Sequence, residues 1–391
     1  MLSVEEAISA VLEGAAPIGH EQAGLGELVG RIAAEDVTAR MTQPPFAASA
    51  MDGYAVRSKD MRVGAELRVI GDAPAGAPFD GTVGAGEAVR IFTGGAVPKG
   101  ADHVIIQEDI ARDGDAIAIR EDQPRARNIR AAGIDFKEGD VLAEKGMRLH
   151  DIHGAIFAAA NINKVSVYRR PKVAVFSNGD ELKEPGADLK PGEIINSDHY
   201  ALTAMISGWG GEAVYLGCAP DSEEAIRDYF RRGAEADVVI PVGGASVGDY
   251  DFVKSGFAKE GGEAVFSKVA VRPGKPTWCG NMGKARVIGL PGNPASAIVT
   301  AALFVQPLVR RLAGDTWSAP FLKARLTAPV GANGGREAYL RAEEKDGAVV
   351  PASNQDSSLL FPFATANALI RRPVNAPALK AGDEVECVRL R

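Results

Sequence analysis

The sequence predicts a multidomain chain in which an α/β unit is joined to β-rich units. Between residues 171 and 315, short apolar runs alternate with amphipathic segments, which is the pattern of a doubly wound parallel sheet. Residues 44–138 and 316–391 instead contain short alternating runs separated by Gly and Pro, and this pattern is typical of compact β structure. At 391 residues, the chain is long enough to bury several separate cores.

The composition excludes several classes of protein. With 46% hydrophobic and 24% charged residues, the chain is typical of soluble globular proteins. Its net charge of -7, without a long Lys/Arg run, argues against a nucleic-acid partner. We expect a cytoplasmic protein with no membrane segment, because the start MLSVEEAISAV is acidic and no uninterrupted apolar stretch reaches about 18 residues. Its three cysteines are far apart, so neither a disulfide framework nor a CxxC metal site is predicted.

Residues 1–43 and 139–170 are predicted to form one elongated unit, into which residues 44–138 are inserted. A capping box, Ser3-x-x-Glu6, opens the first helix, and a second helical segment is expected near residues 25–34. The stretch QPPFAASAMDGYAVRSKD, rich in Pro and small residues, is typical of a hinge into a new domain. Residues 316–391 are expected to form a small β-barrel.

Within the α/β unit, the apolar runs predict strands and the segments between them predict helices. The strands are expected at residues 172–177, 211–219, 237–243 and 286–290, and the helices at 197–209, 221–236, 251–260 and 294–312. The last helix is apolar nearly all round over residues 295–305, so we expect it to be buried against the sheet. Loops that follow the strands should meet at their carboxyl edge, where such sheets bind ligands.

The loop after the third strand of the α/β unit has features of an anion site. Its glycines remove Cβ atoms, so backbone N–H groups can approach a phosphate-like group closely. Carboxylates next to these glycines suggest Mg²⁺ held between the protein and a phosphate. The residues of this loop that we single out are Gly243, Gly244, Ser246, Gly248 and Asp249, followed by Asp251.

Two further loops of the α/β unit favour an oxyanion. In RPGKP, Arg272 and Lys275 lie on a turn that Pro273 and Pro276 make stiff. In LPGNPAS, Gly292 and Asn293 precede a helix that begins at Pro294, and the free N–H groups at a helix start attract anions.

Other polar residues allow both a functional and a structural interpretation. Glu181 in SNGDEL could hold a metal or a substrate hydroxyl, or it could lie in a solvated turn. Asp221 in DSEE could face a ligand or only cap a helix. For Asp52 in MDGYA and Thr93 in IFTGG, an ordinary turn is the alternative. No Ser-His-Asp or Cys-His constellation is readable, which argues against nucleophilic hydrolysis.

Taken together and in order, the motifs resemble the molybdopterin molybdenumtransferases, the MoeA family related to the gephyrin E domain. The stretches that carry the resemblance are PPFAASAMDGYAV, IFTGGAVPKGADHVIIQED, NIRAAGIDFKEGD, SNGDEL, GGASVGDYDFVK, VAVRPGKP and LPGNPASA. They extend from Pro44 to Ser296, and Arg272 departs from the pattern because many members have lysine there.

The resemblance implies an elongated homodimer that inserts molybdate into adenylylated molybdopterin, with release of AMP and help from Mg²⁺. Residues 1–43 and 139–170 would then form the dimerisation unit, and residues 171–315 the molybdopterin-binding unit. It implies catalytic positions at Asp52, Thr93, Asp135, Glu181, Asp221 and Asp251, of which Glu181, Asp221 and Asp251 would hold the metal. It implies molybdate contacts from Arg272, Lys275, Pro276, Ser296, Arg336 and Ser358.

Three alternatives to molybdate insertion stay open at this point. A related enzyme could adenylylate molybdopterin, although such proteins are typically a lone α/β domain. A non-catalytic dimer could carry the finished cofactor or act as a scaffold. A paralogue could insert tungstate, which has nearly the size and charge of molybdate. Molybdopterin adenylyltransferase and molybdoenzyme apoproteins are the protein partners that the resemblance suggests.

Overall fold

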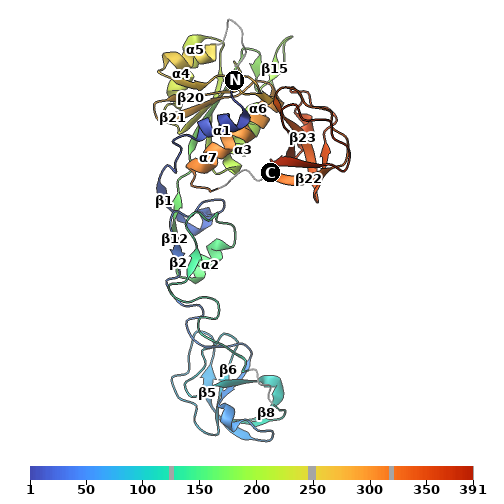
Figure 1. The fold of residues 1–391 in the computed structure, drawn as a ribbon. Helices are drawn as coiled ribbons and strands as arrows, with labels where there is room; N and C mark the ends of the chain where they lie inside the picture. The colour runs from blue at the N-terminus through green and yellow to red at the C-terminus, as the bar shows by residue number, and fades with distance from the viewer. Residues whose placement is uncertain (123–126, 245–251, 317–320, 391) are drawn as a thin grey trace.

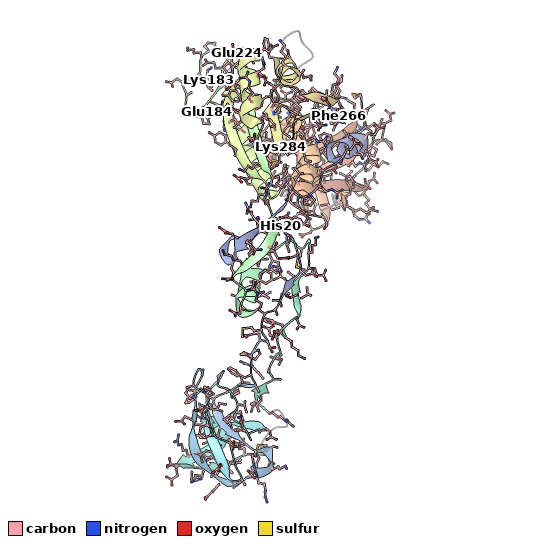
Figure 2. The ribbon with its side chains drawn as sticks, turned by 90° about the vertical axis from the view of Figure 1, so that its left-hand side faces the viewer. His20, Lys183, Glu184, Glu224, Phe266 and Lys284 are labelled. Carbon is pink, nitrogen blue, oxygen red and sulfur yellow. The ribbon has the colours of Figure 1, made fainter. Side chains whose placement is uncertain are left out.

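The computed structural model describes residues 1–122, 127–244, 252–316 and 321–390. Four residues of the predicted loop, Ser246, Gly248, Asp249 and Asp251, lie outside these ranges. The chain is elongated: the α/β unit and the carboxyl-terminal barrel lie at one end, and an inserted β unit lies at the other (Figure 1). A slender middle unit joins the two ends, and Figure 2 shows His20, the first residue of β1, at its junction with the α/β unit.

The sheet of the α/β unit is mixed, with strand order β16-β13-β17-β21-β20-β18. Its strands are β13 (Lys172–Asn178), β16 (Glu212–Ala219), β17 (Val238–Val242), β18 (Glu263–Phe266), β20 (Trp278–Met282) and β21 (Ala285–Gly289). The first four in spatial order are parallel, as the sequence predicts. The predicted all-parallel sheet is nevertheless incomplete, because β20 and β18 extend it in antiparallel fashion. Gly283, at φ +57, makes the tight turn that joins β20 to β21.

Helices cover both faces of this sheet, so the unit is doubly wound. One face carries α1 (Val4–Leu12), α3 (Asp198–Gly208) and the long segment made of α6 (Pro294–Thr300), a π-helical turn (Ala301–Val305) and α7 (Gln306–Leu312). The other face carries α4 (Glu223–Gly233) and α5 (Phe252–Lys259). The predicted capping box of α1 is present. The long segment Pro294–Leu312 is apolar enough to cross a membrane, but 83% of it is buried inside the protein, so it is a core helix.

The middle unit is built from segments on either side of the insertion. Its strands pair as β1 (His20–Gly24) with β12 (Lys164–Tyr168) and β2 (Val37–Thr38) with β11 (Val141–Ala143), and its helix is α2 (His153–Ala159). The helix predicted near residues 25–34 is wrong, because only a short 3-10 turn, Leu25–Glu27, forms there. Gly30 adopts φ +78, which ends any helical run.

Asp315 ties the middle unit to the α/β unit. Its carboxylate accepts a hydrogen bond from Arg148 of the middle unit, at 2.6 Å, and another from Arg310 of α7, at 3.0 Å. The Asp315 side chain is only 10% exposed, so solvent screens these ion pairs less than it would at an open surface.

Both remaining units are β structures. The inserted unit has strand order β7-β4-β6-β5-β9-β8, with β4 (Gly53–Val56), β5 (Glu66–Ala73), β6 (Glu87–Ile91), β7 (His103–Ile106), β8 (Ile110–Asp113) and β9 (Ala116–Ile119); β3 (Ala48–Ser49) pairs with β10 (Ile129–Arg130) beside it. The carboxyl-terminal strands close a barrel in the order β23-β24-β22-β26-β25, because β25 pairs back with β23. These strands are β22 (Phe321–Leu326), β23 (Glu337–Lys345), β24 (Ala348–Pro351), β25 (Ala368–Arg372) and β26 (Glu384–Arg389), and β19 (Val271–Arg272) joins the edge of β23.

Candidate functional site

Two adjoining cavities lie at the carboxyl edge of the α/β sheet, where β13, β17 and β21 end. The first, which we call the inner cavity, has a volume of about 440 Å³ and is lined by Ser177, Asn178, Glu181, Leu182, Ile194, Ile195, Asn196, Ser197, Asp198, Val242, Gly243, Gly244, Pro276, Pro291, Gly292, Asn293 and Pro294. The second, the cationic cavity, has a volume of about 360 Å³. Both are lined by Pro276, Pro291 and Asn293, so one ligand can extend through the two.

The predicted glycines bring the ends of the strands unusually close together. Gly243 and Gly244 both have positive φ, +99 and +61. A Cβ on Gly243 would lie 2.7 Å from the carbonyl oxygen of Asn178, and one on Gly244 would lie 2.3 Å from Val253. A Cβ on Gly292 would approach Gly243 to 3.3 Å. The inner cavity therefore has a wall of bare backbone, as a site for a closely held ligand requires.

Glu181 and Asp221 lie around the turn that follows β13. Asp221 accepts a hydrogen bond from the amide of Asn178 at 2.6 Å, and Glu181 folds back over Gly179 at the rim of the inner cavity. Burial, together with the nearby carboxylates of Glu181, Glu184 and Asp221, raises the pKa of the Cys218 thiol to about 11. These two predicted metal ligands therefore lie near each other, and the Cys218 thiol stays protonated at neutral pH.

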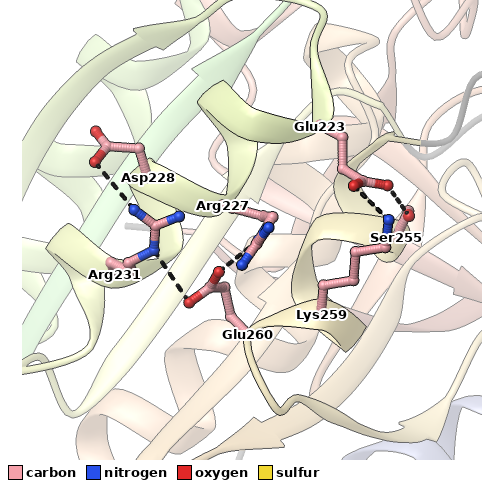
Figure 3. Close-up of polar contacts among 7 residues, drawn as sticks. All are labelled: Glu223, Arg227, Asp228, Arg231, Ser255, Lys259 and Glu260. Carbon is pink, nitrogen blue, oxygen red and sulfur yellow. Dashed lines mark hydrogen bonds and ion pairs between the residues drawn. The ribbon is translucent and has the colours of Figure 1, made fainter.

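A network of ion pairs holds together the two helices that follow Asp221 and Asp251 in the chain (Figure 3). Glu223 of α4 contacts Lys259 of α5 at 2.5 Å. Glu260 accepts hydrogen bonds from Arg227 at 2.6 Å and from Arg231 at 3.2 Å. Because α4 and α5 each begin next to one of the predicted acidic loops, this network fixes the helices from which those loops extend.

The cationic cavity brings together the predicted basic residues. Arg272 and Lys275 are exposed, and within the described residues neither has an ion-pair partner. Arg336 also lines this cavity, and its guanidinium donates to the Val271 carbonyl at 3.2 Å. A Cβ on Gly274 would lie 2.1 Å from Thr300 of α6, so the loop packs closely on the core helix. Arg272 and Lys275 lie on a closely packed loop and have no ion-pair partner among the described residues, so they are suited to binding an anion.

A loop of the barrel covers the start of α6. The Ser357 carbonyl accepts a hydrogen bond from the backbone N–H of Ala295 at 3.0 Å, and Asn293 donates its side-chain amide to the Ser357 hydroxyl. Asn293 occupies the N-cap position, but its side chain makes no capping hydrogen bond. Ser357 lines the cationic cavity, whereas the hydroxyl of the predicted Ser358 donates to Asp356 at 2.6 Å.

Arg341 holds this barrel loop in place, and sequence reasoning missed it. Its side chain is fully buried and donates to the carbonyls of Leu359 at 2.7 Å and Asp356 at 2.9 Å. It also contacts the side-chain oxygen of Gln355, another residue that lines the cationic cavity. An isolated arginine in a strand carries no sequence signal for this role, because the loop it holds lies well beyond it in the chain.

The structure gathers most of the predicted site residues at these cavities. Those that line them are Glu181, Gly243, Gly244, Gly292, Asn293, Pro276, Arg272, Lys275, Ser296 and Arg336. Asp135 lines an open groove in the middle unit instead, together with Phe136, Val141 and Ile156.

Asp52 and Thr93 lie in the inserted unit, far from the cavities of the same chain (Figure 1). Asp52 accepts hydrogen bonds from the backbone N–H of Thr93 at 2.7 Å and from its hydroxyl at 2.8 Å. The backbone bond, followed by the hydroxyl bond, lowers the pKa of Asp52. The pair is therefore a preformed, ionised group at the far end of the molecule.

The polar floor of the inner cavity was not predicted. Ser177 donates to Asn196 at 3.0 Å, Asn196 donates to the Tyr215 hydroxyl at 2.7 Å, and Tyr215 donates back to Ser177 at 3.3 Å. Beside this closed ring lies Asp198, which burial gives a pKa raised to about 6. The signal in the sequence was NSDH at the start of a helix, which is easily interpreted as a cap.

Three family models match the chain in order along its length. They are the MoeA N-terminal region (domain I and II) over residues 2–161, the probable molybdopterin binding domain over residues 174–311, and the MoeA C-terminal region (domain IV) over residues 323–390. Together these matches extend over almost the entire chain.

Relatives and solved structures agree with these matches. The molybdopterin molybdenumtransferase of Haemophilus influenzae is 39% identical, over 82% of this chain and 80% of its own length. That of Nostoc sp. is 34% identical, over 92% and 86% respectively. A crystal structure of a molybdopterin biosynthesis MoeA protein from Pyrococcus horikosii has 34% identity and a TM-score of 0.87, covering 100% of this chain and 99% of that chain. The chain therefore belongs to the MoeA family of molybdopterin molybdenumtransferases, which are transferases of molybdenum cofactor biosynthesis.

Proposed function

We propose that this protein inserts molybdate into adenylylated molybdopterin and releases AMP. The observation that carries the proposal is the adjacency of the two cavities. One has a backbone wall and can hold a ring system, and the other presents Arg272, Lys275 and Arg336 without ion-pair partners among the described residues. A substrate with a heterocycle and phosphates fits the first, and a tetrahedral dianion fits the second.

In this proposal, the residues of the cationic cavity hold molybdate. Arg272 offers a planar fork of N–H donors, and Lys275 offers a compact charge. Ser296, which is 4% exposed, and Ser357 contribute hydroxyls from α6 and from the barrel loop. Ser358 remains a predicted molybdate contact. In the structure, its hydroxyl donates a hydrogen bond to Asp356. Molybdate thus needs no metal ligand from the protein, because the dithiolene sulfurs of the substrate receive the metal.

The acidic residues fit a Mg²⁺ ion that is bound largely by the substrate. Among the described residues, no group of three or more His, Cys, Asp and Glu side chains forms a dedicated metal cage. Magnesium commonly uses one or two carboxylates together with phosphate oxygens and waters, and Glu181 and Asp221 could supply the carboxylates. The third predicted ligand, Asp251, lies outside the described residues. When bound, Mg²⁺ would neutralise charge on the phosphoanhydride as AMP leaves.

A second copy of the chain would complete the site. Asp52 and Thr93 lie at the far end of the elongated chain, and the exposed apolar side chains Phe46, Met51 and Phe92 are their near neighbours in sequence. Exposed apolar residues around a polar pair favour contact with another protein surface. In a homodimer, Asp52 or Asp135 could move the proton that is needed when molybdate loses an oxygen as water.

The expected location and partners of the protein follow from its family and from its surface charge. We propose a cytoplasmic homodimer that acts on small molecules and exchanges them with molybdopterin adenylyltransferase and molybdoenzyme apoproteins. The net charge of -7 disfavours binding to nucleic acid. The apolar segment Pro294–Leu312 is buried in the core of the α/β unit and is therefore not available to enter a membrane.

The decisive experiment follows AMP release by the full-length protein from adenylylated molybdopterin and Mg²⁺, with and without molybdate. Molybdate-dependent release is expected. Release that is equal without molybdate would contradict insertion, and tight binding of the product without any turnover would favour a cofactor carrier. Repeating the titration with tungstate measures which of the two oxyanions is preferred.

A further inference from the structure

The inner cavity has several polar side chains on its floor, and most of them are already satisfied by the protein. Ser177, Asn196 and Tyr215 form the closed ring of hydrogen bonds described above. The Asn178 amide is bound to Asp221. Each of these side chains therefore already has a hydrogen-bond partner within the protein.

Asp198 differs from these neighbours. It is the first residue of α3, it is 7% exposed, and it lines the inner cavity. Among the described residues, the Asp198 carboxylate accepts one long hydrogen bond of 3.4 Å, from the Ser197 hydroxyl to Oδ1. His199, next to it, stacks on Tyr215, and burial lowers the pKa of the imidazole, so His199 is a neutral ring near pH 7 and not a counter-ion. A buried carboxylate with so few partners is costly, which is typical of a group that a ligand completes.

The rest of the inner cavity matches a flat heterocycle. Leu182, Ile194 and Ile195 come from the small ladder β14 (Leu182–Lys183) and β15 (Ile194–Ile195), and Pro276 and Pro291 come from loops of the α/β sheet. Figure 2 shows Lys183 and Glu184 at the outer edge of the α/β unit. The cavity thus has apolar walls and one buried acidic group, the arrangement that fixes the orientation of a small ligand.

We propose that Asp198 recognises the heterocycle of the substrate by accepting two hydrogen bonds from an amidine edge, as a 2-amino-4-oxopteridine presents. This inference rests on the proposed function and deepens it, because it states which half of the substrate enters the inner cavity. A pteridine of this kind offers two adjacent N–H donors, which match the two oxygens of a carboxylate. Adenine offers a donor next to an acceptor nitrogen, and an ionised carboxylate repels that acceptor. Asp198 is therefore a specificity residue for the heterocycle of the substrate.

The test compares three probes on the full-length protein by calorimetry: 6-hydroxymethylpterin, the corresponding 2,4-dioxopteridine, and AMP. The wild type should bind the 2-amino compound at least about tenfold more tightly than the dioxo compound, because the latter lacks the donor pair. In Asp198→Asn, which keeps the shape but offers a single acceptor oxygen, this preference should disappear while AMP affinity stays within about twofold. Lys284→Ala, on the β20–β21 turn, is the matched control and should leave all three affinities unchanged.

The outcomes separate the possible roles of Asp198. An unchanged preference for the 2-amino compound in Asp198→Asn would overturn the proposal. An equal loss of all three ligands would also overturn it, because that result indicates a structural role. Loss of AMP alone would assign the inner cavity to the nucleotide. If the preference depends on Asp198 but molybdate-dependent AMP release is absent, the recognition stands and the proposed reaction fails.

Discussion

The two ends of this elongated molecule carry polar groups in very different surroundings. At the α/β end, Asp198 and the ring around Asn196 are buried in a cavity that the fold has already formed. At the far end, Asp52 is bound to Thr93 on an exposed surface, and its near neighbours in sequence include the exposed apolar side chains Phe46, Met51 and Phe92. The first region already has a formed cavity, which is lined by described residues of one chain. The second has a preformed acid on an exposed surface, so its proposed function requires another surface.

The largest expected effect tests whether a second copy supplies that surface. Asp52→Ala and Asp221→Ala should each lower molybdate-dependent AMP release by at least about 100-fold, since each removes a proposed catalytic group. In dimers mixed from the two variants, one site regains both residues, so about a quarter of wild-type activity should return.

The control for this mixing experiment is a pair of variants from the same end of the molecule. Mixtures of Asp52→Ala with Thr93→Val should stay inactive, because no site in such a dimer has an intact far end. If the Asp52→Ala and Asp221→Ala mixture also stays inactive in confirmed dimers, the two ends do not share a site.

The next effect concerns the cationic cavity. Lys275→Ala should raise the half-saturating molybdate concentration by about tenfold, because a charge-assisted contact to the oxyanion is lost. Lys284→Ala is the matched control, since Lys284 is paired with Glu235 at 3.2 Å and is labelled in Figure 2 on the α/β unit. An unchanged half-saturation value in Lys275→Ala would remove this lysine from the oxyanion site.

Asp198 allows a stability test that distinguishes function from packing. Burial raises the pKa of Asp198 from 3.8 to about 6, so the folded protein loses stability as pH rises from below 4 through 6. Asp198→Asn removes this cost and should be more stable than the wild type by about 3 kcal/mol at pH 8. At pH 3.5 the two proteins should unfold at the same urea concentration. A variant that is less stable at pH 8 would indicate that the carboxylate supports the fold.

The smallest effect concerns the network between α4 and α5. Hydrogen bonds from Arg227 and then Arg231 lower the pKa of Glu260, so the stabilisation is present at neutral pH and is lost as pH falls through that lowered value. Glu260→Gln should lower the melting temperature by about one or two degrees at pH 7, since ion pairs whose arginines are open to solvent contribute little. Glu263→Gln, an exposed site nearby on β18, should have no effect, and equal melting temperatures for both variants would contradict the network's role.

Much of the α/β unit could be predicted because its signals are local. Continuous apolar runs identified β13, β17 and β21, and glycines identified the loops at their ends. The antiparallel pair β18 and β20 was missed because β20 reads Trp278–Met282, which contains Gly and Asn and lacks the continuous apolar character of a buried strand. Its only clear signal was Gly283 in the turn to β21.

The parts of the site that could not be predicted depend on contacts between distant segments. Arg341 shapes a loop of another part of the barrel, and Asn196, just after β15, donates to Tyr215 of β16. The separation of Asp52 from Lys275 was equally invisible, because motifs that lie in order along a sequence carry no information about the distance between units in space. Sequence patterns identified the chemistry of the residues, and tertiary packing determined which of them meet.

The carboxylate of Asp315 accepts hydrogen bonds from Arg148 and Arg310 at the junction between the middle unit and the α/β unit. Because the molecule is elongated, a small change in the angle between these two units would move Asp52, at the far end, by a much larger distance. We therefore expect substitution of any of these three side chains to change the position of Asp52, although none of them lines either cavity.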